Sequence, residues 1–260
     1  MSFENKVVLV TGAAGSIGKG IAEKFLNDGA KVFMTDLNKE VLDGIKREMT
    51  GEGFECEVLA ADVTNQEQVK AVVNKTLERF GGRIDVLINV AGMMTQAPVE
   101  DITEKEWDLM FDVNCKGTFF FVQQVVPVMK KQKSGSIVNF SSKSGKTGSA
   151  LLSHYSAAKA AIIGFTQALA YELAEFSINV NCICPGITED TGVWNTASSG
   201  YIKNLGLSKE DVIKKFTAKV PLGRLAKIED IVEVTYFMSS KGAAYMTGQA
   251  VNVDGGREMH

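Results

Sequence analysis

The octapeptide Thr11-Gly12-Ala13-Ala14-Gly15-Ser16-Ile17-Gly18 lies between an apolar strand-like run, Lys6–Val10, and a helix-like pattern from Gly18 to Leu26. Glycines at such a turn let the backbone come close to a pyrophosphate, and the free N–H groups of the following helix N-terminus attract the anion. A glycine cluster also fits an ordinary connection between a strand and a helix. Its position here favours a phosphate-binding turn that opens a doubly wound α/β fold.

The rest of the chain repeats this alternation of strand and helix. The strand-like runs are Lys6–Val10, Lys31–Asp36, Phe54–Ala60, Ile84–Asn89, Ser136–Phe140, Ile178–Ile183 and Ala250–Val253. Helical patterns cover Gly18–Leu26, Glu40–Met49, Gln66–Phe80, Glu104–Lys131, Tyr155–Glu172 and residues 208–219 and 228–239, and Pro127 is expected to bend or end the fourth of them. Apolar strands separated by helices predict a parallel sheet with helices on both faces. We therefore expect a single doubly wound α/β domain over residues 1–260.

Composition argues against several classes of protein. Hydrophobic residues make up 45% of the chain and charged residues 23%, which is typical of a globular protein. The net charge of -3 gives no general attraction to nucleic acid or to an anionic membrane. The N-terminus lacks the features of a signal peptide, so we expect a cytoplasmic protein. Four cysteines without a C-x-x-C motif, and only two histidines, predict buried thiols and no metal site.

Asp36 closes the second strand-like run and bears on the choice of cofactor. A carboxylate at this position accepts hydrogen bonds from an adenosine ribose and repels a 2′-phosphate. Position 37 and positions 13–16 carry no lysine or arginine that would attract such a phosphate. The sequence therefore favours NAD over NADP.

Tyr155 and Lys159 lie four residues apart on a helical pattern and so share one face of that helix. A nearby ammonium would stabilise the phenolate and lower the pKa of the tyrosine, which could then act as a general acid or base. Taken alone, such a pair is more often part of a solvated helix face. Other motifs in the chain support the catalytic interpretation.

In the order and spacing of these motifs, the chain resembles the short-chain dehydrogenase/reductase family over essentially its whole length. The matching elements are the Thr11–Gly18 turn, Asp36, Asp62-Val63, Asn89-x-Ala91-Gly92, Asn114, Ser141-Ser142, Tyr155-x-x-x-Lys159 and Pro185-Gly186. Two departures stand out. The middle glycine of the usual T-G-x-x-x-G-x-G turn is Ser16, with Gly15 one place earlier, and Val90 interrupts the usual N-N-A-G motif.

The resemblance implies a single Rossmann-type domain with a seven-stranded sheet, a homotetramer and a catalytic set. In that set, Ser142 bonds the substrate oxygen, Tyr155 moves the proton, Lys159 lowers the pKa of Tyr155 and binds the nicotinamide ribose, and Asn114 holds a relay water. The residues implied to contact the cofactor are Gly12, Gly15, Ser16, Ile17, Gly18, Asp36, Asp62, Val63, Asn89, Gly92, Tyr155, Lys159, Pro185 and Thr188.

The tail Val253–Met259 resembles that of polyol dehydrogenases in the family, and acetoin/2,3-butanediol reductases share much of this similarity. We therefore expect NAD-dependent interconversion of a secondary alcohol and a ketone on a polyol or related small sugar-derived substrate. An acetoin/2,3-butanediol or 3-oxoacyl reductase is the alternative enzyme. A nucleotide-sensing regulator with the same fold is the alternative that is not an enzyme.

Residues 187–208 lack clear periodicity and follow a strand at the edge where α/β sheets bind ligands. We expect a loop that acts as a lid, in which the polar groups of Thr188, Glu189, Asp190 and Asn195 bond substrate hydroxyls and Trp194 covers the substrate. The alternative is a static surface loop. The pair Met93-Met94 is expected at the mouth of the pocket. Lys143 and Lys146 either contact an anionic group of the substrate or lie in solvent.

Overall fold

Seven parallel strands form one sheet in the computed structural model, in the order β3-β2-β1-β4-β5-β6-β7. The strands are β1 (Val7–Thr11), β2 (Lys31–Asp36), β3 (Cys56–Ala60), β4 (Val86–Asn89), β5 (Gly135–Phe140), β6 (Ile178–Pro185) and β7 (Ala250–Val253). The structure describes residues 3–192, 194, 196, 198, 202 and 208–259. The doubly wound α/β fold with a seven-stranded parallel sheet is confirmed.

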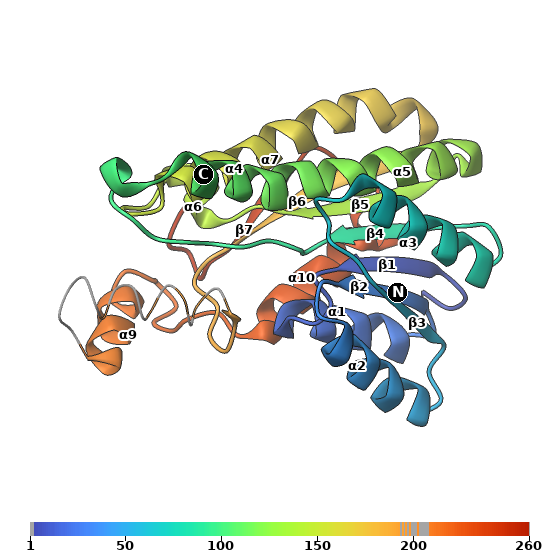
Figure 1. Cartoon of the computed structure of the whole chain (residues 1–260), viewed down its shortest axis with the longest axis horizontal. Coiled ribbons are helices and arrows are strands. Elements are labelled where there is room, and N and C mark those ends of the chain that lie inside the picture. The colour runs from blue at the N-terminus through green and yellow to red at the C-terminus, as the bar shows by residue number, and fades with distance from the viewer. Residues whose placement is uncertain are drawn as a thin grey trace.

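Helices cover both faces of this sheet (Figure 1). The N-terminal helices α1 (Ser16–Asn27) and α2 (Lys39–Gly51) lie on one face with α10 (Ile228–Ser239). The other face carries α3 (Gln66–Arg79), α4 (Glu104–Phe111), α5 (Gly117–Gln132) and α7 (Ser153–Leu173). The short helix α6 (Lys143–Thr147) follows β5, and α9 (Lys209–Thr217) lies away from the sheet. Short 3-10 turns occur at Val99–Asp101, Ala174–Phe176 and Lys241–Ala243.

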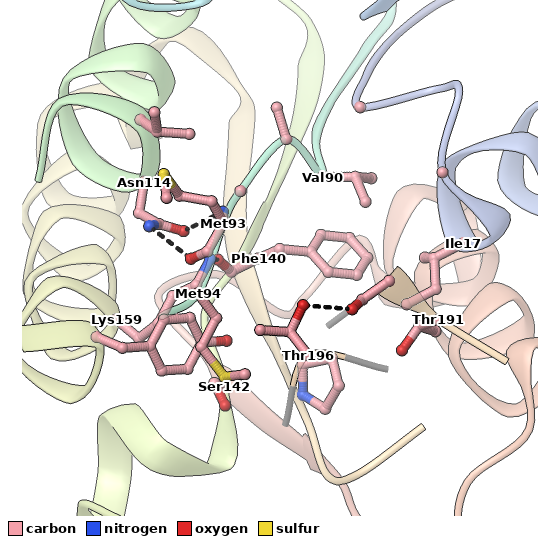
Figure 2. A pocket seen from close by; sticks show the side chains of 18 of the residues that line it. Ile17, Val90, Met93, Met94, Asn114, Phe140, Ser142, Lys159, Thr191 and Thr196 are labelled. Atoms are coloured by element: carbon pink, nitrogen blue, oxygen red, sulfur yellow. Dashed lines mark hydrogen bonds between the residues drawn. The ribbon is translucent and has the colours of Figure 1, made fainter. Parts of the chain in front are cut away.

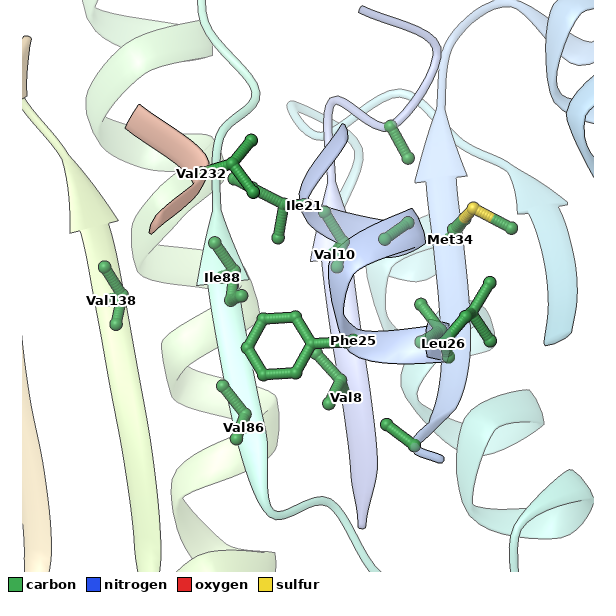
Figure 3. Close-up of a cluster of buried hydrophobic side chains, with 14 of the residues drawn as sticks. Val8, Val10, Ile21, Phe25, Leu26, Met34, Val86, Ile88, Val138 and Val232 are labelled. Carbon is green, nitrogen blue, oxygen red and sulfur yellow. The ribbon is translucent and has the colours of Figure 1, made fainter. Parts of the chain in front are cut away.

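The two-residue period of the strands divides the core into two layers. Val8 and Val10 of β1 contact α1 and α10, whereas Val7 and Leu9 belong to the cluster beneath α3, α5 and α7. Figure 3 shows the first of these layers, in which Phe25 of α1 lies over the valines of β1 and β4. Because both faces are covered, every residue of β1 is buried, which explains why this strand is apolar without interruption.

The sheet reverses its winding between β1 and β4, which are neighbours in the sheet although β2 and β3 separate them in sequence. Ligands of doubly wound sheets bind at the carboxyl ends of the strands on either side of such a point. Here these ends lead into the turn after β1 and the segment after β4. The topology therefore places the phosphate-binding turn at the expected edge of the sheet.

The expected helix Glu104–Lys131 is divided at a place that the sequence did not suggest. A π-helical turn, Asp112–Lys116, separates α4 from α5. Pro127 neither bends the chain out of the helix nor ends it, because it lies inside α5, which continues to Gln132. The break instead coincides with Asn114. Single π turns in helices are frequently found at functional sites.

The segment 187–208 also differs from the irregular loop that was expected. Gly192, Trp194, Thr196, Ser198 and Ile202 have helical backbone, whereas Ser208 is the extended N-cap of α9. A segment without a helical pattern of apolar residues can still form a helix when tertiary contacts stabilise it. The sequence pattern therefore did not predict the helical backbone of this segment. The expectation for the remaining positions of this segment lies outside the described residues.

Candidate active site

A cavity of about 830 Å³ runs along the carboxyl ends of the strands. It is lined by the phosphate-binding turn, the segments after β2 to β6, α6, α7 and Arg257 near the C-terminus. Sixteen of the predicted site residues line it together: Gly12, Gly15, Ser16, Ile17, Gly18, Asp36, Asp62, Val63, Gly92, Asn114, Ser142, Tyr155, Lys159, Pro185, Thr188 and Trp194. One continuous cavity thus connects the predicted cofactor and substrate residues.

Close packing requires two of the three glycines of the phosphate-binding turn. Gly12 has a φ of +69°, and a Cβ there would lie 2.7 Å from the backbone nitrogen of Ala91. A Cβ on Gly18 would lie 2.2 Å from the carbonyl oxygen of Gly12. These two positions bring the turn against the segment after β4 and against the first turn of α1. Gly15 has no such restriction, since its Cβ would be 3.4 Å from the nearest atom.

Two carboxylates lie at the β2–β3 end of the cavity. Asp36 accepts a 3.1 Å hydrogen bond from the backbone nitrogen of Ala14, which couples the end of β2 to the phosphate-binding turn. Asp62 is bonded within its own loop, where its Oδ1 accepts from the backbone and the hydroxyl of Thr64. None of the ion pairs among the described residues includes Asp36, and its neighbour Lys39 pairs with Asp43 instead.

Asn89 is the one predicted cofactor residue that does not line the cavity. Its side chain is 2% exposed and lies beneath the floor, where it donates a 2.9 Å hydrogen bond to Asn139 of β5. Asn139 in turn donates to Thr166 of α7. A buried polar side chain needs such partners, so Asn89 acts as a cross-link between β4, β5 and α7.

Gly92 lies where three elements converge. A Cβ at this position would be 2.7 Å from Oδ1 of Asn114 and 3.2 Å from Nζ of Lys159. Asn114, in the π turn, donates from Nδ2 to the carbonyl oxygens of Met93 and Met110, each at 3.0 Å, and Figure 2 shows its amide turned toward Met93. The absent side chain of Gly92 is therefore what lets the two polar groups approach the segment after β4.

Lys159 is 4% exposed and donates a 3.0 Å hydrogen bond to the carbonyl oxygen of Phe140 at the end of β5. Burial lowers the pKa of its ammonium to about 8, because removal from water disfavours the charged form. Desolvation thus brings the pKa of Lys159 close to neutral pH.

Tyr155 lies one helical turn before Lys159, whose Nζ is 5.7 Å from the centroid of its ring. Burial raises the pKa of Tyr155, and a hydrogen bond with Ser142 offsets part of this effect. This differs from the sequence expectation of a lowered pKa. The physical reason is that both side chains are shielded from water, so desolvation of the phenolate outweighs the stabilising groups.

Ser142 has a second function as the N-cap of α6. Its Oγ accepts a 3.1 Å hydrogen bond from the backbone nitrogen of Ser144. The cap fixes the side chain at the cavity wall across from Ile17 and Val90 (Figure 2). Because α6 is only one turn long, the sequence pattern did not reveal it.

The substrate half of the cavity has an apolar wall. Met93 and Met94 line it as expected, together with Leu152, Trp194 and Phe216. Trp194 is 4% exposed and packs edge-on against Phe216 of α9, with ring centroids 6.4 Å apart. Thus Trp194 both packs in a hydrophobic cluster and faces the cavity. Phe216 carried no signal in the sequence, since its helix is remote from every recognised motif.

The segment after β6 is attached to the loop before α10. Thr188 pairs with Ala226 in an isolated parallel bridge, and Glu189 donates its N–H to the carbonyl oxygen of Ala226. Of the lid residues expected to bond substrate hydroxyls, Thr188 lines the cavity, whereas Glu189 and Asp190 do not. The described polar residues of this segment that do line it are threonines: Thr188, Thr191 and Thr196.

The two lysines of α6 have different surroundings. Lys143 lines the cavity, whereas Lys146 donates a 2.7 Å hydrogen bond to the carbonyl oxygen of Ala250 and does not line it. Arg257 also lines the cavity and was not predicted as a site residue. The sequence pointed to Arg257 only through its position in Val253–Met259, the C-terminal segment that resembles polyol dehydrogenases.

Comparison with known proteins agrees with this geometry. Residues 12–258 match a family model described as enoyl-(acyl carrier protein) reductase. The chain is 39% identical over 256 residues to the 3-oxoacyl-(acyl-carrier-protein) reductase FabG of Thermotoga maritima, covering 98% of this chain and 99% of that protein. The chain belongs to the short-chain dehydrogenase/reductase family.

Two further members have similarly complete matches. Galactitol 2-dehydrogenase of Agrobacterium fabrum is 38% identical over 263 residues, covering 100% of both chains. A crystal structure of a variant of actinorhodin polyketide ketoreductase with NADPH matches with a TM-score of 0.93 at 33% identity, covering 99% of both chains. As a short-chain dehydrogenase/reductase, the protein is an oxidoreductase of alcohols, rather than the nucleotide-sensing regulator that the sequence left open.

The residues present fit the nicotinamide cofactor of short-chain dehydrogenases/reductases. The close approach at Gly12 and Gly18 leaves room for a pyrophosphate beside the N-terminus of α1. The carboxylates of Asp36 and Asp62 line the end of the cavity that an adenosine would occupy.

In the described part of the chain, no helix has the length and apolar character needed to cross a bilayer.

Proposed function

We propose that this protein is an NAD-dependent dehydrogenase that interconverts a secondary alcohol and a ketone on a polyol or related small sugar-derived substrate. The observation that carries the proposal is that Ser142, Tyr155 and Lys159 line the same cavity as the phosphate-binding turn and Asp36. We also propose that residues 1–260 act as one catalytic domain, because the strands between residues 7 and 253 join in one sheet.

The proposed mechanism assigns one function to each polar residue. When bound, the nicotinamide ring supplies or accepts the hydride. Tyr155 gives its proton to the carbonyl oxygen during reduction and takes it back during oxidation, as a general acid and base. Ser142 donates a hydrogen bond to the same oxygen. The ammonium of Lys159 stabilises the phenolate that forms, and Asn114 holds the segment after β4 in place through Met93.

The preference for NAD is proposed from Asp36. Its carboxylate has no cationic partner among the described residues, so a 2′-phosphate beside it would be repelled. We expect kcat/KM to be higher with NAD than with NADP. The Asp36→Ala variant should narrow this difference, since it removes repulsion without adding attraction. Higher kcat/KM with NADP in the wild-type enzyme would refute the assignment.

The polyol substrate is supported by the 38% identity to galactitol 2-dehydrogenase over the whole length. A screen for NADH formation with polyols, sugar acids and diols tests it. A 3-oxoacyl or acetoin/2,3-butanediol reductase is favoured instead by one observation, the apolar wall of Met93, Met94, Leu152 and Trp194. Faster turnover of 3-oxoacyl thioesters or acetoin than of every polyol would establish that alternative.

We also propose a homotetramer, supported by exposed apolar side chains on the helices α4, α5 and α7. Trp107 and Phe119 are 43% and 41% exposed, and Tyr171 is 89% exposed. Light scattering should then give four times the 28.1 kDa mass of the chain. The four cysteines are free, three of them buried, which supports the proposed cytoplasmic location.

A further inference from the structure

The charged residues that line the cavity are separated by sign. Asp36 ends β2 and Asp62 follows β3, and both lie on one side of the point where the sheet reverses. Lys143 follows β5, Lys159 lies in α7 and Arg257 follows β7, all on the other side. Among the described lining residues, no carboxylate lies on that second side. The substrate half of the cavity is therefore positively charged, which a neutral polyol does not require.

Lys143 adjoins Ser142 in sequence and begins α6. Its ammonium is 3.2 Å from the carbonyl oxygen of Gly148 and 3.5 Å from Oγ of Ser149. It is also 3.5 Å from Oε1 of Glu258, and its side chain is 15% exposed. Charge-assisted hydrogen bonds are usually about 2.7–2.9 Å long. All three contacts are longer, so the ammonium is held at the cavity wall without a short bond to any of these oxygens.

Arg257 supplies the second cation. Its guanidinium lies 5.8 Å from the ring centroid of Phe216 and donates a 3.5 Å hydrogen bond to the carbonyl oxygen of the same residue. None of the ion pairs among the described residues includes Arg257. Since Phe216 also contacts Trp194, the guanidinium belongs to the same wall as the proposed substrate cover.

We propose that Lys143 and Arg257 bind an anionic oxygen group of the substrate, and that this group is a carboxylate. The inference rests on the proposed function and narrows it from polyols to their hydroxy-acid relatives. Glu258 offsets one of the two positive charges, which leaves one net charge for a monoanion. Ser142 lies directly before Lys143, so the bound carboxylate and the reacting oxygen share one wall of the cavity.

Matched pairs of substrates isolate the charge. Gluconate and gluconamide carry the same hydroxyls, as do 3-hydroxybutyrate and its amide, and only the acids are anionic. We expect kcat/KM with NAD to favour the acid of a reactive pair by about tenfold or more, the size of one hydrogen bond between charged groups. Lys143→Met should bring the acid-to-amide ratio close to one, and Lys143→Arg should retain most of it.

Lys146→Met is the control, because it removes a lysine of the same helix whose ammonium bonds Ala250 outside the cavity. It should leave the acid-to-amide ratio unchanged. Arg257→Gln gives a second test should Lys143→Met not fold, and it should also lower the ratio. An equal loss of the ratio in Lys146→Met and Lys143→Met would overturn the proposal. Sorbitol 6-phosphate preferred over gluconate would overturn the choice of carboxylate.

Calorimetric titration of gluconate and gluconamide into the NADH-loaded protein separates this inference from the proposed function. Turnover of both members of each pair at equal kcat/KM would overturn the inference and leave the alcohol dehydrogenase intact. Absence of turnover of every alcohol would refute the proposed function. In that case, tighter binding of gluconate than of gluconamide, lost in Lys143→Met, would still support the anion site, and equal or absent binding would overturn it.

Discussion

The hydroxyl of Ser16 donates a 2.8 Å hydrogen bond to the main-chain oxygen of Asp190, a residue 174 positions later in the chain. Ser16 occupies the place where the family turn usually has a glycine. Its side chain thus links the phosphate-binding turn to the segment after β6. Asp190 has a positive φ of 58°, so this carbonyl is presented by an uncommon backbone conformation.

The Ser16→Ala variant tests whether the hydroxyl of Ser16 affects cofactor binding only through its hydrogen bond to Asp190. The bond is solvent-exposed, and such hydrogen bonds contribute about 1 kcal/mol. We therefore expect the Kd for NADH to rise by no more than about fivefold in a fluorescence titration. Ser16→Gly should behave similarly. A rise of a hundredfold in both variants would mean that the hydroxyl contacts the cofactor directly.

Gly92→Ala should abolish turnover. The added methyl group would lie 2.7 Å from Oδ1 of Asn114 and 3.2 Å from Nζ of Lys159, so at least one of these groups must move. Gly164→Ala is the matched control, because it lies in the exposed face of α7 with no atom within 4 Å of its Cβ. That variant should keep its activity and gain about 0.5–1 kcal/mol of stability. Full activity in Gly92→Ala would show that the close approach is unimportant.

Tyr155→Phe should lose about 10²–10⁴-fold in kcat and retain its affinity for NADH, because the ring stays while the transferable proton is removed. Tyr236→Phe is a suitable control. Its phenol donates a 2.6 Å hydrogen bond to Asp28, away from the cavity. This control should lower the unfolding free energy but not kcat. Near-normal turnover in Tyr155→Phe would rule out the proposed mechanism.

Lys159→Met should stabilise the folded chain while it inactivates the enzyme. The pKa of Lys159 falls to about 8 on folding, from 10.5, so burial of the ammonium destabilises the native state at neutral pH. Because the unfolded chain binds more protons between pH 8 and 10.5, the wild type gains stability as pH rises through that window. The advantage of the variant, about 3 kcal/mol at pH 7, should shrink by about 1 kcal/mol at pH 9. Urea unfolding at the two pH values measures this difference.

Trp194→Ala should raise KM for the best substrate several-fold, since it removes an apolar group that faces the substrate half of the cavity. The affinity for NADH should change much less. We propose that residues 187–208 act as a lid, and limited proteolysis within them should be slowed by NAD with a substrate analogue. Equal cleavage in both states, with unchanged KM in Trp194→Ala, would identify the segment as a static part of the surface.

The sequence was sufficient for the strands and for most of the site because each signal was local. The run Val7–Val10 is apolar on both faces, and close packing fixes Gly12 and Gly18 in the turn that follows. Tyr155 and Lys159 are related by one turn of a single helix. Such relationships depend on spacing within one element, which the chain displays directly.

The features that the sequence did not reveal depend on contacts between distant elements. Asn89 was expected beside the cofactor, but whether its amide faces the cavity or Asn139 depends on the packing of β5. Arg257 and Phe216 reach the cavity only because the C-terminal segment crosses α9. The raised pKa of Tyr155 arises from burial, which spacing along a helix does not report.

The π turn at Asp112–Lys116 determines how the α4–α5 region would respond to the deletion of one residue. A regular α-helix advances by about 100° for each residue, whereas a π turn is wound more loosely and holds one extra residue without changing the phase of the helix that follows. Deletion of one residue between 112 and 116 would restore a regular helix from α4 into α5. The same deletion would keep Phe121, Val125 and Met129, all fully buried, facing the core. The extra residue is therefore dispensable for the packing of α5, and its structural effect is confined to the widened turn that carries Asn114.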